Sequence, residues 1–302
     1  MLYIDNRKKF YKKNFKRNCH SSGMLVELEV RKDLFSTAQA IIRKIVEKSY
    51  FFTHHKKLSF EEILKIKKLN LLNKTPNGLL TIQQEISQEY QMLHEIYSDI
   101  LINLKLNKYI NKIHFPLALR ITNKFLKTIS QRKKSISTPH SDLWVGHDID
   151  ATIWLPFFGD LNTSGINFFE PIGVSENFSK TYDSFQEAAK NSFKKTIQIK
   201  PKLKLGNLYM FDAYCLHGTM QKKNTNYRIS FDSYFNFKQK ISGRKKSGNS
   251  NLDKFYIDVR KFTDIGYSNK LISSMNFAKT KKFFLKKNNK ILNPHEFGRL
   301  VK

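Results

Sequence analysis

Four side chains from two distant stretches of the sequence have the right types to hold a metal ion and an anion. His140 and Asp142 lie two residues apart in the run TPHSDLW, and His217 and Arg228 lie in the later run CLHGTMQKKNTNYRIS. Two neutral imidazole nitrogens and one carboxylate oxygen can occupy one face of an octahedral iron(II) ion and leave the other positions open. A guanidinium nearby can clamp a carboxylate. This set predicts chemistry that activates oxygen.

The three metal-ligand candidates are weak individually and informative together. An isolated His-x-Asp is typical of a surface turn, and a lone histidine is more often a satisfied core residue than a ligand. In an extended chain, however, residues i and i+2 point to the same face, so His140 and Asp142 can meet one ion. His217, followed by Gly218 at the end of an aromatic segment, can supply the third ligand from a separate strand.

Arg228 lies in the apolar segment YRISFDSYF, where a guanidinium costs free energy unless an anion meets it. The chain has 44 Lys and 10 Arg, so an arginine at this place favours bidentate geometry over simple charge. Ser230 shares its face of the strand and can donate to the same carboxylate. The alternative is an edge-strand arginine paired with an acidic residue such as Asp232.

The spacing of apolar residues predicts helices in the first third of the chain and strands in the part that must position these residues. The first third is predicted to be helical after an edge strand at 25–31, with helices over 36–50, from Ser59 with its capping-box partner Glu62, and from about Thr81 to 104. Short β-branched or aromatic segments follow, which predict a sandwich or barrel. They are 115–121, the HSDLW run, 151–157, 165–171, 196–201, 207–217 and 227–235.

The series His140-x-Asp142, His217 and Arg228-x-Ser230 resembles the iron(II)/2-oxoglutarate-dependent dioxygenases. The resemblance covers about residues 115–237 and looks closest to the phytanoyl-CoA dioxygenase-like branch. The segments that carry it are HSDLW, IWLPF, NFFEP, GNLYMFDAYCLHG and YRISF.

The resemblance implies an α+β fold, with a double-stranded β-helix (jelly roll) as its core and flanking N-terminal helices. It also implies that His140, Asp142 and His217 are the catalytic residues that ligate Fe(II). Arg228, assisted by Ser230, would bind the distal carboxylate of 2-oxoglutarate, and O2 would be the second co-substrate.

Four further residues are candidates for the pocket. Arg120 can reach 2-oxoglutarate or an anionic substrate, or it can be a solvated strand-end residue. Asn167 resembles a polar position of the family's central strand, although a turn residue explains it too. Trp144 shares the alternation of His140 and Asp142 and can line the pocket or belong to the core. His147 follows Gly146 and is assigned to a loop in contact with substrate.

The same patterns divide the chain into four regions. Residues 1–22 are expected to be a basic, flexible arm, and 23–112 a helical region packed on the barrel. The catalytic jelly roll takes 113–238, with 172–195 as a candidate lid because it interrupts the strand series and contains a short helix starting after Ser184. Residues 239–302 are expected to be a basic C-terminal extension.

The formal net charge of +29 is compatible with several partners. A nucleic acid or an anionic membrane surface fits such a charge. The lysines, however, are dispersed in pairs along the sequence, which is typical of a compositional bias, and no nucleic-acid motif accompanies them. An anionic small molecule, such as a nucleotide sugar or a coenzyme A ester, fits equally well.

Composition also indicates the setting. With 40% hydrophobic and 13% aromatic residues, the chain can build a core. Two cysteines, no secretory signal and no apolar run of about 20 residues favour a cytoplasmic protein without a membrane span. We therefore expect an oxygenase that hydroxylates a small or carrier-bound metabolite while 2-oxoglutarate is decarboxylated to succinate. The alternative is a non-catalytic jelly-roll binding module with a basic surface for nucleic acid or another polyanion.

Overall fold

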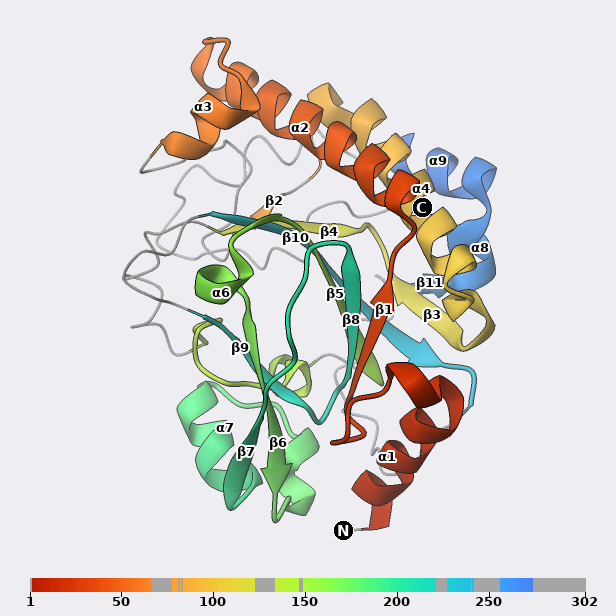
Figure 1. Cartoon of the computed structure of the whole chain (residues 1–302), viewed down its shortest axis with the longest axis vertical. Coiled ribbons are helices and arrows are strands. Elements are labelled where there is room, and N and C mark those ends of the chain that lie inside the picture. Colours follow the sequence, from red (N-terminus) through yellow and green to blue (C-terminus); the bar gives the residue numbers. More distant parts are fainter. Residues whose placement is uncertain are drawn as a thin grey trace.

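The computed structural model describes residues 2–66, 78–80, 82, 84–122, 134–146, 149–220, 227–239, 241 and 256–273. In this part of the chain, two antiparallel sheets pack against each other, and helices cover the outer side of the larger sheet (Figure 1). This is an α+β fold with a jelly-roll core and flanking helices, as the sequence predicted. No helix within these ranges is long and apolar enough to cross a bilayer.

The larger sheet forms one wall of the core. Its strands follow the order β1-β8-β5-β10-β3-β11, and β4 also pairs with β10 and with the short β2. All of these pairs are antiparallel. The strands are β1 (Leu25–Glu29), β2 (Leu79–Leu80), β3 (Ile110–His114), β4 (Ala118–Thr122), β5 (Ala151–Gly159), β8 (Asn207–Asp212), β10 (Arg228–Phe237) and β11 (Tyr256–Asp258).

Strand β10 is buried on both faces, because helices cover one face and the smaller sheet covers the other. Ile229, Phe231 and Phe235 join the apolar cluster beneath the helices, whereas Tyr234 belongs to the cluster between the sheets. Successive residues of a strand point to opposite faces. Arg228, six residues before Tyr234, therefore points between the two sheets.

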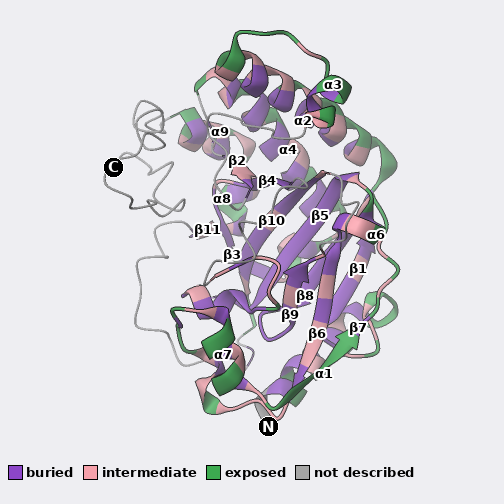
Figure 2. Cartoon of the chain, turned by 90° about the vertical axis from the view of Figure 1, so that its left-hand side faces the viewer, coloured by how far each residue is buried: buried purple, intermediate pink, exposed green. Residues whose placement is uncertain are grey.

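The smaller sheet has the order β7-β6-β9 and consists of β6 (Ile166–Ile172), β7 (Lys195–Ile199) and β9 (Leu216–Thr219). Phe168 of β6 packs on Phe211 of β8 with ring centroids 5.1 Å apart, which joins the two sheets. Strand β7 lies at the edge and is largely exposed (Figure 2).

The single strand predicted over 207–217 is two strands that belong to different sheets. The backbone N–H of Tyr214 donates to the Asp212 carboxylate, and that of Cys215 donates to the Asp212 carbonyl, which closes a turn after β8. The chain thereby crosses to the smaller sheet before it reaches His217.

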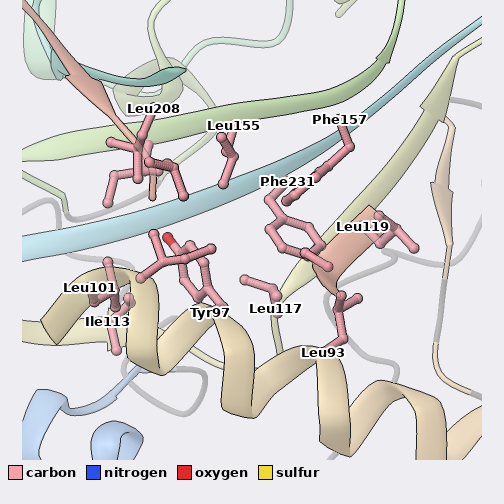
Figure 3. Close-up of a cluster of buried hydrophobic side chains, with 14 of the residues drawn as sticks. Leu93, Tyr97, Leu101, Ile113, Leu117, Leu119, Leu155, Phe157, Leu208 and Phe231 are labelled. Carbon is pink, nitrogen blue, oxygen red and sulfur yellow. The ribbon is translucent and has the colours of Figure 1, made fainter. Parts of the chain in front are cut away.

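Two long helices, α2 (Lys32–His54) and α4 (Ser87–Asn103), lie across the larger sheet. Figure 3 shows the side chains of α4 facing those of the strands, with Leu93, Tyr97 and Leu101 on one side and Leu155, Phe157 and Phe231 on the other. The shorter α3 (Phe60–Lys65) begins with the predicted capping box. The helix predicted from Thr81 begins later, at Ser87 after a 3-10 turn at Gln84–Ile86, and Thr81 itself lies outside the described residues.

The flexible arm expected at residues 1–22 is instead a packed helix, α1 (Leu2–Phe15), followed by a 3-10 turn at Lys16–Asn18. Its lysines cluster in the sequence and suggested an arm, but three of its aromatic side chains are buried against the main core. They are Phe10, Tyr11 and Phe15.

The C-terminal extension expected at 239–302 also contributes to the fold where it is described. Strand β11 adds to the larger sheet beside β3, and helices α8 (Val259–Thr263) and α9 (Ile265–Ser273) pack near α4. Phe262 and Ile272 are fully buried there. Residues 242–255 and 274–302 lie outside the described residues.

We predict that Phe231→Ala lowers the free energy of unfolding by about 3–5 kcal/mol, because it empties a site between Tyr97 and Phe157. Urea denaturation followed by circular dichroism measures this change. Met92→Ala on α4 is the control, since Met92 is 42% exposed and its truncation should cost less than about 0.5 kcal/mol. Equal losses in the two variants would contradict the assignment of this interface as the main core.

Candidate metal centre

A backbone bridge brings the two histidines together. The N–H of His140 donates to the carbonyl of His217 at 2.9 Å, and the N–H of His217 donates to the carbonyl of His140 at 2.9 Å. Residues paired in this way lie directly opposite each other, with their side chains on the same face. Their ring centroids are accordingly 4.5 Å apart.

Asp142 reaches the same point through a turn and not through strand alternation. Ser141 is extended, with φ −106° and ψ 141°, and Asp142 then opens the 3-10 helix η4 (Asp142–Val145). The HSDLW run is therefore a single bridge followed by a 3-10 turn, which corrects the predicted strand. The three residues still converge, because ligand atoms of His140, Asp142 and His217 all lie within 4.8 Å of one another.

The Ser141 side chain holds this turn. Its hydroxyl donates to the Ala213 carbonyl at 2.7 Å and accepts from the Leu143 N–H at 3.1 Å. The first bond ties the His140–Asp142 segment to the turn between β8 and β9. The segment is thus attached at two adjacent residues, His140 and Ser141, to the part of the chain that carries His217.

The electrostatics of the group suit metal ligands. Burial lowers the pKa of His140 to about 3 and that of His217 to about 4, so both imidazoles are neutral at neutral pH and their lone pairs are free to bind a cation. Burial raises the pKa of Asp142. A divalent cation would offset this cost of burying the carboxylate, whose Oδ2 lies 3.6 Å from His217 Nε2.

Two hydrogen bonds orient the candidate ligands. His140 Nδ1 lies 2.7 Å from the Thr138 carbonyl, an arrangement that assigns the proton to Nδ1 and leaves Nε2 as the metal-binding atom. The Thr152 hydroxyl donates to Asp142 Oδ2 at 2.8 Å. Thr138 and Thr152 were not recognised in the sequence, since a threonine in a strand or turn carries no distinctive signal.

The insertion at 172–195 contributes directly to the site. Its helix α7 (Phe185–Ser192) is capped by Ser184, as predicted, and the Phe185 ring stacks on the His140 ring at 4.3 Å with the planes 6° apart. Phe185 therefore shields one side of His140 from water. Nothing in the sequence distinguished Phe185 from the other 24 phenylalanines.

Gly218 is required by close packing and not by a turn. It lies within β9, and a Cβ at this position would be 3.1 Å from the Ser137 carbonyl oxygen and 3.3 Å from Pro139 N. The glycine lets the segment before His140 approach β9 closely enough to form the bridge.

Arg228 is buried, with 1% of its surface exposed, and donates to backbone carbonyls. Its Nη1 lies 2.5 Å from the Ser164 oxygen and 3.0 Å from the Gly165 oxygen, and Nη2 lies 3.5 Å from Thr219 Oγ1. Burial lowers the pKa of Arg228 to about 10, so the group stays charged. Among the described residues no carboxylate pairs with it, and its Nε has no hydrogen-bond partner.

Arg120 already has an acidic partner. It forms an ion pair with Asp232 on the neighbouring strand, and Ser230 Oγ lies 3.5 Å from the other Asp232 oxygen. Asp232, which the sequence offered as a partner for Arg228, forms its ion pair with Arg120 instead, although its charge still raises the pKa of Arg228. Arg120 lies directly opposite Ser230 in the register of β4 and β10, so its side chain shares the face of β10 that carries Arg228. The charge of Arg120 is one of the smaller effects that lower the pKa of His140 and His217.

Among the described residues, the side chains of two other candidates, Trp144 and Asn167, do not join the site. Trp144 lies in η4, outside any strand alternation; it is fully buried, packs on Phe178 and donates its indole N–H to the Phe178 carbonyl. In the register of β6 and β9, Phe168 and not Asn167 lies opposite His217, so Asn167 points to the other face. His147 lies outside the described residues.

Comparison with known proteins gives structural likeness only. No family model and no curated protein matches the chain. Among solved structures, the carbocyclase SnoK from nogalamycin biosynthesis, described as non-heme and alpha-ketoglutarate-dependent, is similar at a TM-score of 0.46 and 8% identity, covering 81% of this chain and 90% of its own. The epimerase SnoN of the same biosynthesis is similar at 0.40 and 11%, covering 82% and 88%.

A third similar structure is an N-substituted L-amino acid dioxygenase from Burkholderia ambifaria AMMD in complex with alpha-KG. The TM-score is 0.33 at 11% identity, and the match covers 71% of this chain and 85% of the other.

We predict that Thr152→Val weakens divalent metal binding about 10-fold, because it removes the hydroxyl that orients Asp142 and keeps the shape of the side chain. Calorimetric titration with Co(II), which is stable in air, measures the affinity. Thr196→Val on the exposed strand β7 is the matched control and should bind as the unaltered chain does. An unchanged affinity in Thr152→Val would show that Asp142 is not a ligand oriented from β5.

Proposed function

We propose that the chain is an iron(II)/2-oxoglutarate-dependent oxygenase that hydroxylates a small or carrier-bound metabolite. The observation that carries the proposal is the convergence of His140, Asp142 and His217 beside a buried arginine that has no carboxylate partner among the described residues. The motif resemblance favours the phytanoyl-CoA dioxygenase-like branch.

The donor set supports iron as the metal. Two neutral imidazoles and one carboxylate form the three-ligand arrangement of non-haem iron(II) oxygenases, in which the remaining positions stay open. His140 and His217 would hold the ion from the two segments that the backbone bridge joins, and Asp142 would supply the third ligand from its 3-10 turn. When bound there, iron with 2-oxoglutarate and O2 supplies oxidative decarboxylation to succinate and the oxidation of a substrate C–H bond.

The environment of Arg228 supports a dicarboxylate. A buried guanidinium bound only to neutral groups is costly, and an anion that reaches its free Nε would offset that cost. Thr219, which accepts from Arg228, lies two residues after His217 on the same face of β9. A short dicarboxylate can therefore contact the metal with one end and the guanidinium with the other, and Ser230 on the same face as Arg228 is our candidate for a second donor.

The chain's own residues would shape the rest of the reaction. Phe185 covers His140 and excludes water from that side of the metal, and residues 172–195 are our candidate for the lid that selects substrate. The Arg120–Asp232 ion pair holds Arg120 in place, so we assign it to the substrate side of the pocket and assign the co-substrate carboxylate to Arg228.

The first test is anaerobic addition of iron(II) and 2-oxoglutarate. We expect a weak visible charge-transfer band that Asp142→Ala abolishes, because the carboxylate is one of three ligands. Asp33→Ala, which removes an exposed carboxylate on α2, should keep the band. Absence of the band in well-folded unaltered protein would reject the oxygenase and favour the non-catalytic binding module.

The second test separates the co-substrate from the metal. We expect Arg228→Lys to weaken 2-oxoglutarate binding at least ~30-fold, since losing a partner of a buried charge-assisted pair costs about 2–5 kcal/mol. Saturation of the visible band measures 2-oxoglutarate affinity, and Co(II) titration without 2-oxoglutarate measures the metal. Arg31→Lys, at an exposed ion pair, is the control. Equal losses of both affinities would count against the role of the guanidinium.

A further inference from the structure

The geometry points to Arg7 of helix α1 as a positioning residue for the metal centre, although it lies far from His140 and His217 in the sequence and touches neither in any described contact. This inference rests on the proposed function, since it concerns the same metal ligands. It assigns helix α1 a specific role, which is to hold the 212–215 turn in place. This turn contacts the segment that carries His140 and Asp142 and leads into the strand that carries His217.

Arg7 binds the ends of two strands of the larger sheet at once. Its Nε donates to both carboxylate oxygens of Asp212 at 3.0 and 2.8 Å, and its Nη2 donates to the Asp150 carbonyl at 2.7 Å. Its Nη1 lies 3.5 Å from Asp150 Oδ1. Asp212 ends β8 and Asp150 immediately precedes β5, so one guanidinium fixes the spacing of these two strands at this end of the sheet.

The same two aspartates accept further hydrogen bonds from the surrounding backbone. The Asp150 carbonyl also accepts from the Ala213 N–H at 3.0 Å, and Asp150 Oδ2 accepts from the Phe237 N–H at 3.0 Å. Asp212 Oδ1 accepts from the Tyr214 N–H at 2.8 Å. Arg7 is therefore the central donor of a network that joins the ends of β5, β8 and β10.

Two short routes lead from this network to the metal ligands. The Ala213 carbonyl accepts from Ser141 Oγ at 2.7 Å, and Ser141 lies between His140 and Asp142 in the sequence. On the other route, Thr152, two residues after Asp150, donates to Asp142 Oδ2 at 2.8 Å. A shift of the 212–215 turn would thus move the segment that carries His140 and Asp142, and it would also move the start of β9, which carries His217.

Helix α1 itself packs against both sheets, so the backbone of Arg7 is held in place. Ile4 joins the apolar cluster between the sheets, and Lys8 forms an ion pair with Glu170 of β6. Gly23 lies so close to the helix that a Cβ there would meet Lys8 and Lys12 side-chain atoms at 3.0 Å. Figure 1 shows α1 below the lower ends of the strands of the larger sheet, close to the chain's N-terminus.

Electrostatics explain why an arginine is needed at this place. Burial alone would lower the pKa of Arg7, but the carboxylates of Asp212 and Asp150 outweigh that effect and hold the pKa above its ordinary value. Without the guanidinium, the two buried carboxylates would keep their backbone N–H donors but lose this compensating positive charge, which favours opening of the turn toward water. A lysine supplies the charge but cannot reproduce two bonds to Asp212 together with one to the Asp150 carbonyl.

The test compares metal affinity with stability in two variants of α1. We expect Arg7→Lys to weaken Co(II) binding about 10-fold, as loss of a group that orients metal ligands typically does. Phe15→Ala is the matched control, because Phe15 packs on Tyr109 at the other end of the helix and makes no contact with the 212–215 turn among the described residues. It should lose at least as much stability in urea yet bind Co(II) within about 2-fold of the unaltered chain.

A double variant tests the route through Ala213. We expect Ser141→Ala to weaken Co(II) binding, and Arg7→Lys combined with Ser141→Ala to weaken it little more than either change alone, because both act on the same turn. Multiplicative losses in the double variant would overturn the route. Unchanged affinity in Ser141→Ala would overturn it as well, even if Arg7→Lys did not fold.

The outcomes for the inference and for the proposed function are distinct. If the unaltered chain binds no Co(II), the metal centre itself is rejected. If it binds Co(II) and Arg7→Lys loses stability but, like Phe15→Ala, keeps its Co(II) affinity within about 2-fold, then Arg7 is a structural residue alone and the inference is overturned.

Discussion

The backbone bridge between His140 and His217 is the contact on which the rest of the candidate site depends. Two reciprocal N–H to carbonyl bonds place the imidazoles side by side. Gly218 permits the approach, because a side chain there would meet the backbone of 137–139. Asp142 joins them as the first residue of the 3-10 helix, directly after the extended Ser141. A metal site built in this way has its geometry set by backbone hydrogen bonds, which are less adaptable than side-chain rotamers.

The buried arginines differ in whether the protein itself supplies an acidic partner for them. Arg7 pairs with Asp212 and Asp150, and Arg120 pairs with Asp232, so in both cases the protein supplies the compensating charge. Arg228 is as buried as Arg7, yet in the described part of the chain its side-chain hydrogen bonds go only to carbonyl and hydroxyl oxygens, and its guanidinium lies over the Trp154 ring. Burying a charge without a counterion is unfavourable. The contrast is the physical reason for proposing that an anionic ligand binds Arg228 and not Arg7 or Arg120.

Much of the architecture could be predicted from local patterns. Apolar spacing indicated α2, the Ser59–Glu62 pair marked the start of α3, and alternating aromatic segments indicated β5, β6 and β10. The incorrect predictions have a common cause: a local sequence pattern does not show which other segments of the chain pack against it. The lysines of residues 1–22 suggested an arm, but the aromatic side of α1 is buried against the core. The segment 207–217 has one continuous pattern, yet the turn at Asp212 sends its halves to different sheets.

By itself, the sequence determined which side chains could do chemistry: two histidines, an aspartate and an arginine, in an order and spacing that suits a metal and an anion. It could do so because residue type and strand spacing are local properties. Tertiary structure alone decided that Phe185 would stack on His140, that Thr152 would orient Asp142, and that Trp144 and Asn167 would be directed elsewhere. For Thr152 and Asn167 the outcome depends on strand register, since a one-residue change of register would send each side chain to the opposite face. For Phe185 and Trp144, which lie in helices, it depends on the packing of distant segments.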